Sequence, residues 1–162
     1  MAPNTPTFGL APLAEVTGQD GIDFLRGIVA GRYPAPPISR TLGFRLLEVD
    51  VGHAVFEGTP DERLLNPIAT VHGGYIATLL DSAMACAVHS TLKAGQAYTT
   101  VEIKIAFIRP LTEETGPVRA TGKLINAGRR LGVADGTLTD AKGRILAHGS
   151  TTCMIFAVDG KG

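Results

Sequence analysis

The chain has 162 residues, 44% hydrophobic and 19% charged, a length and balance that fit one globular domain with a sizeable core. Its 15 Lys and Arg residues are matched by 15 Asp and Glu residues, so net charge gives no case for binding nucleic acid or an anionic membrane. No apolar run reaches about 18 residues, and the N-terminus lacks a cationic start followed by an apolar stretch. We therefore expect no membrane span, no signal peptide and a soluble cytoplasmic protein.

Residues 1–40 are predicted to form an N-terminal tail with one short helix. Residues 1 to about 17 are rich in Pro and Thr and are expected to be loosely ordered. The helix is predicted within residues 17–31, with Thr17 as its cap. The Pro-rich residues 34–37 predict an extended connector between this helix and the folded domain.

Residues 41–158 are predicted to form the folded domain. Residues 41–60 predict two strands that turn near Gly52. After a loop, a long helix is expected from about Gly74 to Leu92, and because it is apolar on almost every side it must be surrounded by other elements. Strands do not alternate with helices, so the class is α+β, with a sheet curled around the helix. Four later strands are predicted within residues 97–110, 116–128, 129–140 and 143–156.

His72, Gly73 and Gly74 stand where the loop becomes the long helix. The first turn of a helix has free backbone N–H groups at the positive end of the helix dipole, and glycine lets a ligand approach them closely. Such a site suits a carbonyl oxygen that gains negative charge during nucleophilic attack. The amide of Asn66, a few residues earlier, could reach the same oxygen or a water molecule.

Asp81 is a carboxylate near the middle of this apolar helix, where an ionised group is costly unless it is paired or used. It either faces solvent or caps a loop, or it is the general base or nucleophile of an acyl-transfer hydrolysis. Eight residues separate it from Gly73, roughly 12 Å along the helix axis. If both groups act on one carbon, they come from two chains of a dimer with antiparallel central helices, which predicts two shared sites.

Asn66, the HGG sequence at 72–74, Asp81 and TTVEIKIAFIRP at 99–110 occur one after another in this order. In this pattern the chain resembles the hotdog-fold acyl-CoA thioesterases, in the branch of the phenylacetate-pathway (PaaI-like) and 4-hydroxybenzoyl-CoA thioesterases. The resemblance covers roughly residues 40–156. It implies an antiparallel sheet wrapped around one long central helix, and hydrolysis of an aryl- or medium-chain acyl-CoA to the free acid and coenzyme A. It implies no cofactor, since coenzyme A is part of the substrate, and it implies a homodimer, with pairing of dimers into tetramers left open.

The resemblance also implies roles for individual residues. Asp81 activates water or attacks the thioester directly, and the N–H of Gly73 polarises the thioester carbonyl. Asn66 lies on the carbonyl or substrate side of the site. Thr100 matches a hydroxyl that helps to hold the water, with Thr99 as its rival. Further candidates for substrate contact are His72, Gly74, Arg109, Arg129 and Arg130, the arginines toward the nucleotide end of coenzyme A.

Some of these candidates have an ordinary structural alternative. A histidine at a helix start more often fixes the loop by a hydrogen bond, and this role is favoured for His72. A pair of arginines beside a turn is more often a solvated face. A metal site is not expected, because no third ligand accompanies His72 and Asp81. Cys86 and Cys153 are expected to be buried free thiols.

Two other functions compete with thioester hydrolysis. One is a hotdog hydratase or dehydratase, whose sites usually pair a histidine with an acid in a different arrangement. The other is a non-catalytic acyl-CoA-binding module, in which the carboxylate would be absent. The acyl group itself is not determined by the sequence, and the residues before the domain either cover the acyl pocket or pack outside it. That pocket is expected to be lined by Tyr75, Leu79, Met84 and Phe107.

Overall fold

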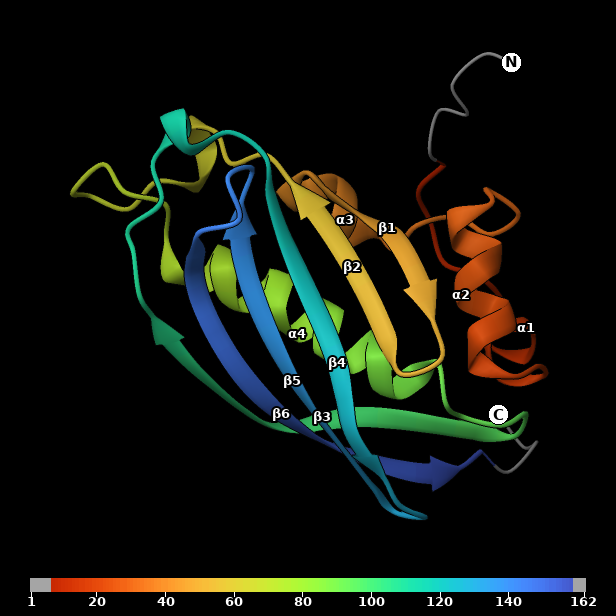
Figure 1. Cartoon of the computed structure of the whole chain (residues 1–162). Coiled ribbons are helices and arrows are strands. Elements are labelled where there is room, and N and C mark those ends of the chain that lie inside the picture. The colour runs from red at the N-terminus through yellow and green to blue at the C-terminus, as the bar shows by residue number, and fades with distance from the viewer. Residues whose placement is uncertain (1–6, 159–162) are drawn as a thin grey trace.

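The computed structural model describes residues 7–158, in which a six-stranded antiparallel sheet curls around one long helix (Figure 1). The sheet order is β1-β2-β4-β5-β6-β3, so β1 and β3 form its edges. The predicted α+β class with a central helix is confirmed. The strands are β1 (Phe44–Asp50), β2 (His53–Gly58), β3 (Gln96–Phe107), β4 (Val118–Ala127), β5 (Leu131–Asp140) and β6 (Ile145–Ala157). The helices are α1 (Leu13–Thr17), α2 (Gly21–Val29), α3 (Pro37–Leu42) and α4 (Gly73–His89), with short 3-10 turns at Glu62–Leu64 and Glu113–Thr115.

The central helix α4 lies very close to the sheet because glycines face it. A Cβ atom on Gly122 of β4 would lie 2.2 Å from the carbonyl oxygen of Ala83. On the next strand, a Cβ atom on Gly136 would lie 2.7 Å from the side chain of Met84. The helix side chains that face the sheet are fully buried, Leu79 and Leu80 among them. Because Gly122 and Gly136 have no side chains, the helix can pack at this short distance from the sheet.

Replacing Gly122 with Ala is expected to lower the free energy of unfolding by about 2–3 kcal/mol or more, because the added methyl group would overlap the helix backbone. Urea denaturation monitored by circular dichroism measures the change. The control is Gly128→Ala, where the new Cβ would lie 3.4 Å from its nearest neighbour. An unchanged denaturation midpoint for Gly122→Ala would mean that this close contact does not hold the helix on the sheet.

Strand β3 contains a bulge that determines which of its side chains face α4. Its pairing with β6 shifts register between Thr100 and Glu102, which leaves Val101 as an extra residue. A bulge inverts the alternation of side chains beyond it. Thr100 on one side of the bulge therefore reaches α4, and so does Phe107 on the other side, whose ring lies against the backbone of Gly73.

The N-terminal segment differs from its prediction. Instead of one helix after a loose tail, the described part holds α1, α2 and α3, and α3 begins where an extended connector was expected. Thr17 ends α1 rather than capping α2, whose N-cap is Asp20. Proline suits the first turn of a helix, which explains why α3 begins at Pro37. The predicted loose order of residues 1–6 lies outside the described residues.

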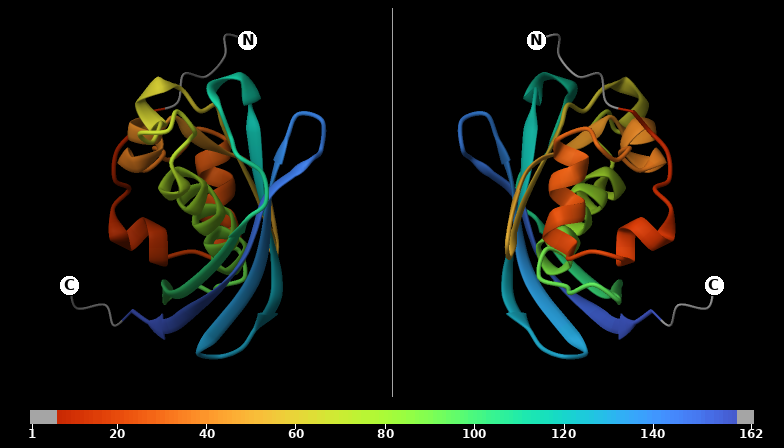
Figure 2. Two further views of the ribbon diagram at one scale, coloured as in Figure 1. Left: turned by 90° about the vertical axis from the view of Figure 1, so that its left-hand side faces the viewer. Right: turned by 90° about the vertical axis from the view of Figure 1, so that its right-hand side faces the viewer.

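This segment packs on the face of α4 that the sheet leaves open (Figure 2). Its attachment is at the C-terminal end of α4, where the N–H of Gly21 donates to the carbonyl of Leu92 at 3.0 Å. The ring of Phe24 lies 5.8 Å from that of His89, centroid to centroid. The last residues of α4 are thus enclosed between sheet and N-terminal helices. Within residues 7–158, no helix is both long and apolar enough to cross a membrane.

Candidate active site

The N-terminus of α4 is fixed by His72. Its Nδ1 atom accepts a hydrogen bond from the N–H of Gly74 at 2.8 Å, and its backbone N–H donates to the carbonyl of Leu64 at 2.7 Å. This is the loop-fixing contact predicted for His72, and it occupies the N–H of Gly74. The N–H of Gly73 has no hydrogen-bond partner among residues 7–158. One free donor therefore remains at the positive end of the helix.

Gly73 lines a hollow of about 320 Å³ beside the end of β3. The ring of Phe107 lies close to Gly73, since a Cβ atom at this position would be only 3.2 Å from it. Arg109 lines the same hollow, and its guanidinium donates to the carbonyl of Ile145. A hydrogen-bond donor and a cation thus lie beside one opening.

Asn66 acts within its own loop. Its Nδ2 atom donates to the hydroxyl of Thr70 at 2.8 Å, and its Oδ1 atom accepts from the N–H of Ile68 at 3.1 Å. These contacts close the turn that leads into His72. In a single chain the polar atoms of the Asn66 side chain are therefore used to shape the loop, and Asn66 does not line the hollow beside Gly73.

Asp81 lies further along α4, is half-buried and forms a side-chain hydrogen bond with β3. Its Oδ1 atom accepts a hydrogen bond from the hydroxyl of Thr100 at 3.0 Å. Both residues line a cavity of about 600 Å³, and Thr99 joins them from the same strand. The structure thus brings together three of the residues singled out in the sequence. Across residues 7–158, no group of three or more His, Cys, Asp or Glu side chains is placed to hold a metal ion.

Gly73 and Asp81 line two different openings of the chain, the 320 Å³ hollow and the 600 Å³ cavity. Gly73 lies against Phe107 near one end of β3, whereas Asp81 pairs with Thr100 near the other end. The wide spacing inferred from the sequence is therefore present in the fold. A single chain presents a carboxylate in one opening and a free helix N-terminus in another.

The arginine candidates are also separated. Arg109 follows the C-terminal end of β3, beside Gly73. Arg129 and Arg130 are exposed in the turn before Leu131, which pairs with Met154 of β6. Met154 in turn pairs with Thr99. The arginine pair therefore lies toward the Asp81 end of the sheet.

The residues around the 600 Å³ cavity are largely different from those expected. Tyr75, Leu79 and Met84 are buried in the core, and Phe107 lines the hollow beside Gly73 instead. The cavity is bounded by the N-terminal segment on one side and by α4 and β3 on the other. Among the lining residues that sequence reasoning missed are Leu10, Val16, Phe24, Leu25, His89 and Tyr98.

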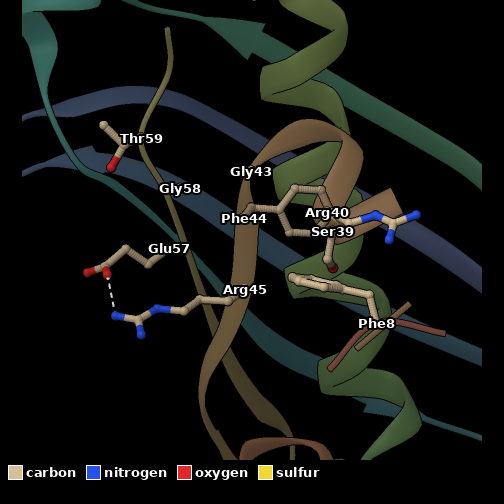
Figure 3. Close-up of a pocket in the computed structure, with 9 residues that line it drawn as sticks. All are labelled: Phe8, Ser39, Arg40, Gly43, Phe44, Arg45, Glu57, Gly58 and Thr59. Atoms are coloured by element: carbon tan, nitrogen blue, oxygen red, sulfur yellow. Dashed lines mark hydrogen bonds and ion pairs between the residues drawn. The ribbon is translucent and has the colours of Figure 1, made fainter. Parts of the chain in front are cut away.

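A second hollow of about 380 Å³ lies between the start of β1, the end of β2 and α3 (Figure 3). Phe8 and Phe44 are its aromatic lining, and an ion pair between Arg45 and Glu57, 2.9 Å apart, lies at its side. None of the candidate site residues lines this hollow. Gly73 and Arg109 line the 320 Å³ hollow instead, and Asp81, Thr99 and Thr100 line the 600 Å³ cavity.

Burial keeps His89, Tyr98 and Cys86, which line the large cavity, neutral. It lowers the pKa of His89 to about 4 and raises that of Tyr98 well above its usual value. Burial, with a smaller effect of the Asp81 charge, raises the pKa of the Cys86 thiol to about 12. At neutral pH the cavity therefore presents an uncharged imidazole, phenol and thiol next to one carboxylate.

The depressed pKa of His89 predicts a dependence of stability on pH. The folded chain binds a proton at His89 less tightly than the unfolded chain does. The stability that comes from keeping His89 neutral is therefore fully present above about pH 6.5 and is lost as the pH falls toward 4. The loss between pH 7 and pH 5 is expected to be about 2 kcal/mol. Urea denaturation of the wild type and of His89→Phe at both values tests this. An equal loss in the two proteins would exclude His89 as its source.

Comparison with known proteins agrees with a hotdog-fold hydrolase. A model of the thioesterase superfamily matches residues 69–147. Acyl-coenzyme A thioesterase PaaI of Escherichia coli strain K12 is 31% identical over 104 residues, covering 64% of this chain and 71% of PaaI. The chain therefore belongs to the thioesterase superfamily, and the predictions of a hotdog fold and of a thioester hydrolase are confirmed.

Other relatives cover more of the chain. Human acyl-coenzyme A thioesterase 13 is 29% identical over 132 residues, covering 79% of this chain and 91% of the relative. The crystal structure of a phenylacetic acid degradation-related protein from Ralstonia eutropha JMP134 superimposes with a TM-score of 0.73 at 28% identity. That superposition covers 81% of this chain and 98% of the other.

Proposed function

We propose that this protein is an acyl-CoA thioesterase that hydrolyses an acyl-CoA to the free acid and coenzyme A without a cofactor. The observation that carries the proposal is the Asp81 carboxylate, held by the Thr100 hydroxyl at 3.0 Å, on the wall of a cavity with space for an acyl group. The names of the Escherichia coli and human relatives, both acyl-coenzyme A thioesterases, support the substrate class.

The proposed chemistry needs one base and one oxyanion donor. Thr100 donates to one oxygen of Asp81, which leaves the other oxygen to take a proton from water as that water attacks the thioester carbon. The N–H of Gly73 stabilises the negative oxygen of the tetrahedral intermediate. Collapse of the intermediate breaks the C–S bond, and the proton held by Asp81 returns to the coenzyme A thiolate. Direct attack by Asp81, through an acyl-enzyme anhydride that water then hydrolyses, gives the same products.

The donor in this scheme is the Gly73 of a partner subunit. Strand β3 is an edge strand with exposed apolar side chains, including Val101 at 55% and Phe107 at 58% exposure. Such an edge favours pairing with a second strand. Antiparallel pairing of β3 with its copy about an axis between Ile103 and Lys104 would set Thr100 opposite the partner's Phe107. Because Phe107 touches Gly73 and Thr100 touches Asp81, this pairing completes two sites per homodimer.

The function is tested by offering the protein phenylacetyl-, benzoyl- and straight-chain acyl-CoA esters and measuring the thiol released. At least one ester is expected to be hydrolysed, at a rate that a metal chelator does not change. If esters bind in calorimetry but no thiol is released, the protein is a binding module. Loss of the enoyl absorbance of an enoyl-CoA without thiol release would identify a hydratase instead.

A further inference from the structure

Two residues of α4, Asp81 and His89, line the large cavity at different points along its length. Asp81 lines one part, and His89 lines another, eight residues later in the same helix. This spacing corresponds to roughly 12 Å along the helix axis. Phe24 of the N-terminal segment lies against His89, and Leu10 and Leu25 of the same segment also line the cavity. The segment therefore covers the cavity rather than packing away from it.

Two polar groups in this wall have no hydrogen-bond partner among residues 7–158. They are the imidazole of His89, which is only 8% exposed, and the hydroxyl of Tyr98 on β3. Their rings pack together with centroids 5.2 Å apart. Within the described residues, Tyr75 alone has a side-chain polar atom that is both sealed from solvent and unpartnered. The polar atoms of His89 and Tyr98 thus stay accessible, on residues that line the cavity.

The character of these groups indicates what they would bind. Because the polar atoms of His89 and Tyr98 are accessible on residues that line the cavity, they can hydrogen-bond to a ligand that can donate and accept hydrogen bonds. Both groups are uncharged at neutral pH, because burial lowers the pKa of His89 and raises that of Tyr98. They therefore suit a neutral hydroxyl or carbonyl group and offer no counter-charge to a carboxylate.

We propose that the preferred substrate is a medium-chain acyl-CoA whose acyl group carries a hydroxyl or oxo group at its far end, recognised by His89 and Tyr98 beneath the N-terminal segment. This proposal rests on the proposed thioesterase function and adds the substrate class. The chain of the acyl group lies against the apolar side chains between Asp81 and His89, and its terminal oxygen forms hydrogen bonds with His89 and Tyr98. Tyr98 and His89 act in binding and take no part in cleavage.

The test compares octanoyl-CoA, ω-hydroxyoctanoyl-CoA and the ω-carboxy ester of the same length. The wild type is expected to show kcat/KM about tenfold higher for the hydroxy ester than for either of the others. Tyr98→Phe, which removes one oxygen and keeps the ring, should lower the ratio of kcat/KM for the hydroxy ester to that for octanoyl-CoA about tenfold. The matched control is Tyr33→Phe, because the Tyr33 hydroxyl accepts from Gln19 and does not line the cavity.

The outcomes separate this inference from the function on which it rests. Hydrolysis of all three esters without preference, or an unchanged hydroxy-to-octanoyl ratio in Tyr98→Phe, would overturn the inference and leave the thioesterase function intact. Failure to release thiol from any acyl-CoA would overturn the function itself. A preference for the hydroxy ester that is lost in Tyr98→Phe and kept in Tyr33→Phe would support both.

Discussion

Replacing Asp81 with Asn is expected to reduce kcat for thioester hydrolysis by about 10²–10⁴-fold and to leave the binding of acyl-CoA esters largely intact. The amide has nearly the shape of the carboxylate, and its oxygen can still accept the hydrogen bond from Thr100. It can neither take a proton from water nor attack the thioester. Thiol release measures the rate, and calorimetry with a slowly hydrolysed ester measures the binding.

Two further variants locate this effect. Asp23→Asn removes an exposed carboxylate from α2, outside the cavity, and should leave kcat unchanged. Thr100→Val removes the hydrogen bond to Asp81 and should lower kcat only about tenfold, since the carboxylate itself remains. Turnover by Asp81→Asn at the wild-type rate would exclude this residue as base and as nucleophile.

The elements of the domain could be predicted because their signals are local. The hairpin, the apolar helix and the four later strands are indicated by periodicity and turn residues within each segment. The bulge in β3 could not be predicted in this way. It decides that Thr100 rather than Thr99 pairs with Asp81, and it results from a register shift against β6, which lies about fifty residues away in the chain.

The walls of the 600 Å³ cavity were harder to predict than the pairing of Asp81 with a threonine of the next strand. A helix that is apolar on every side gives no sign of which side faces the sheet, so the sequence pattern wrongly places Leu79 and Met84 in the pocket although they form the core. The wall of the 600 Å³ cavity contains Leu10 and Phe24, whose position depends on how a distant segment packs on the end of α4. The role of the N-terminal segment therefore became clear only in the folded chain.

Replacing Gly73 with Pro is expected to lower kcat by about 10²–10³-fold, because it removes the one N–H proposed to stabilise the oxyanion. The backbone tolerates this change. Gly73 is the first residue of α4, where proline is favoured, and His72 has φ −62° and ψ 134°, an extended conformation suited to a following proline. Gly73→Ala is the matched control, since it adds the same Cβ against Phe107 and keeps the N–H. Equal rates for the two variants would contradict the role of the N–H.

The same variant tests whether the site is shared between subunits. In a heterodimer of Asp81→Asn and Gly73→Pro chains, a shared arrangement places both defects in one site and leaves the other site with an intact Asp81 and an intact Gly73. Random mixing should then restore about a quarter of the wild-type activity, since half of the dimers are mixed and each has one working site. If each site lay within one chain, every site in the mixture would carry a defect and activity would stay at the level of the parent variants.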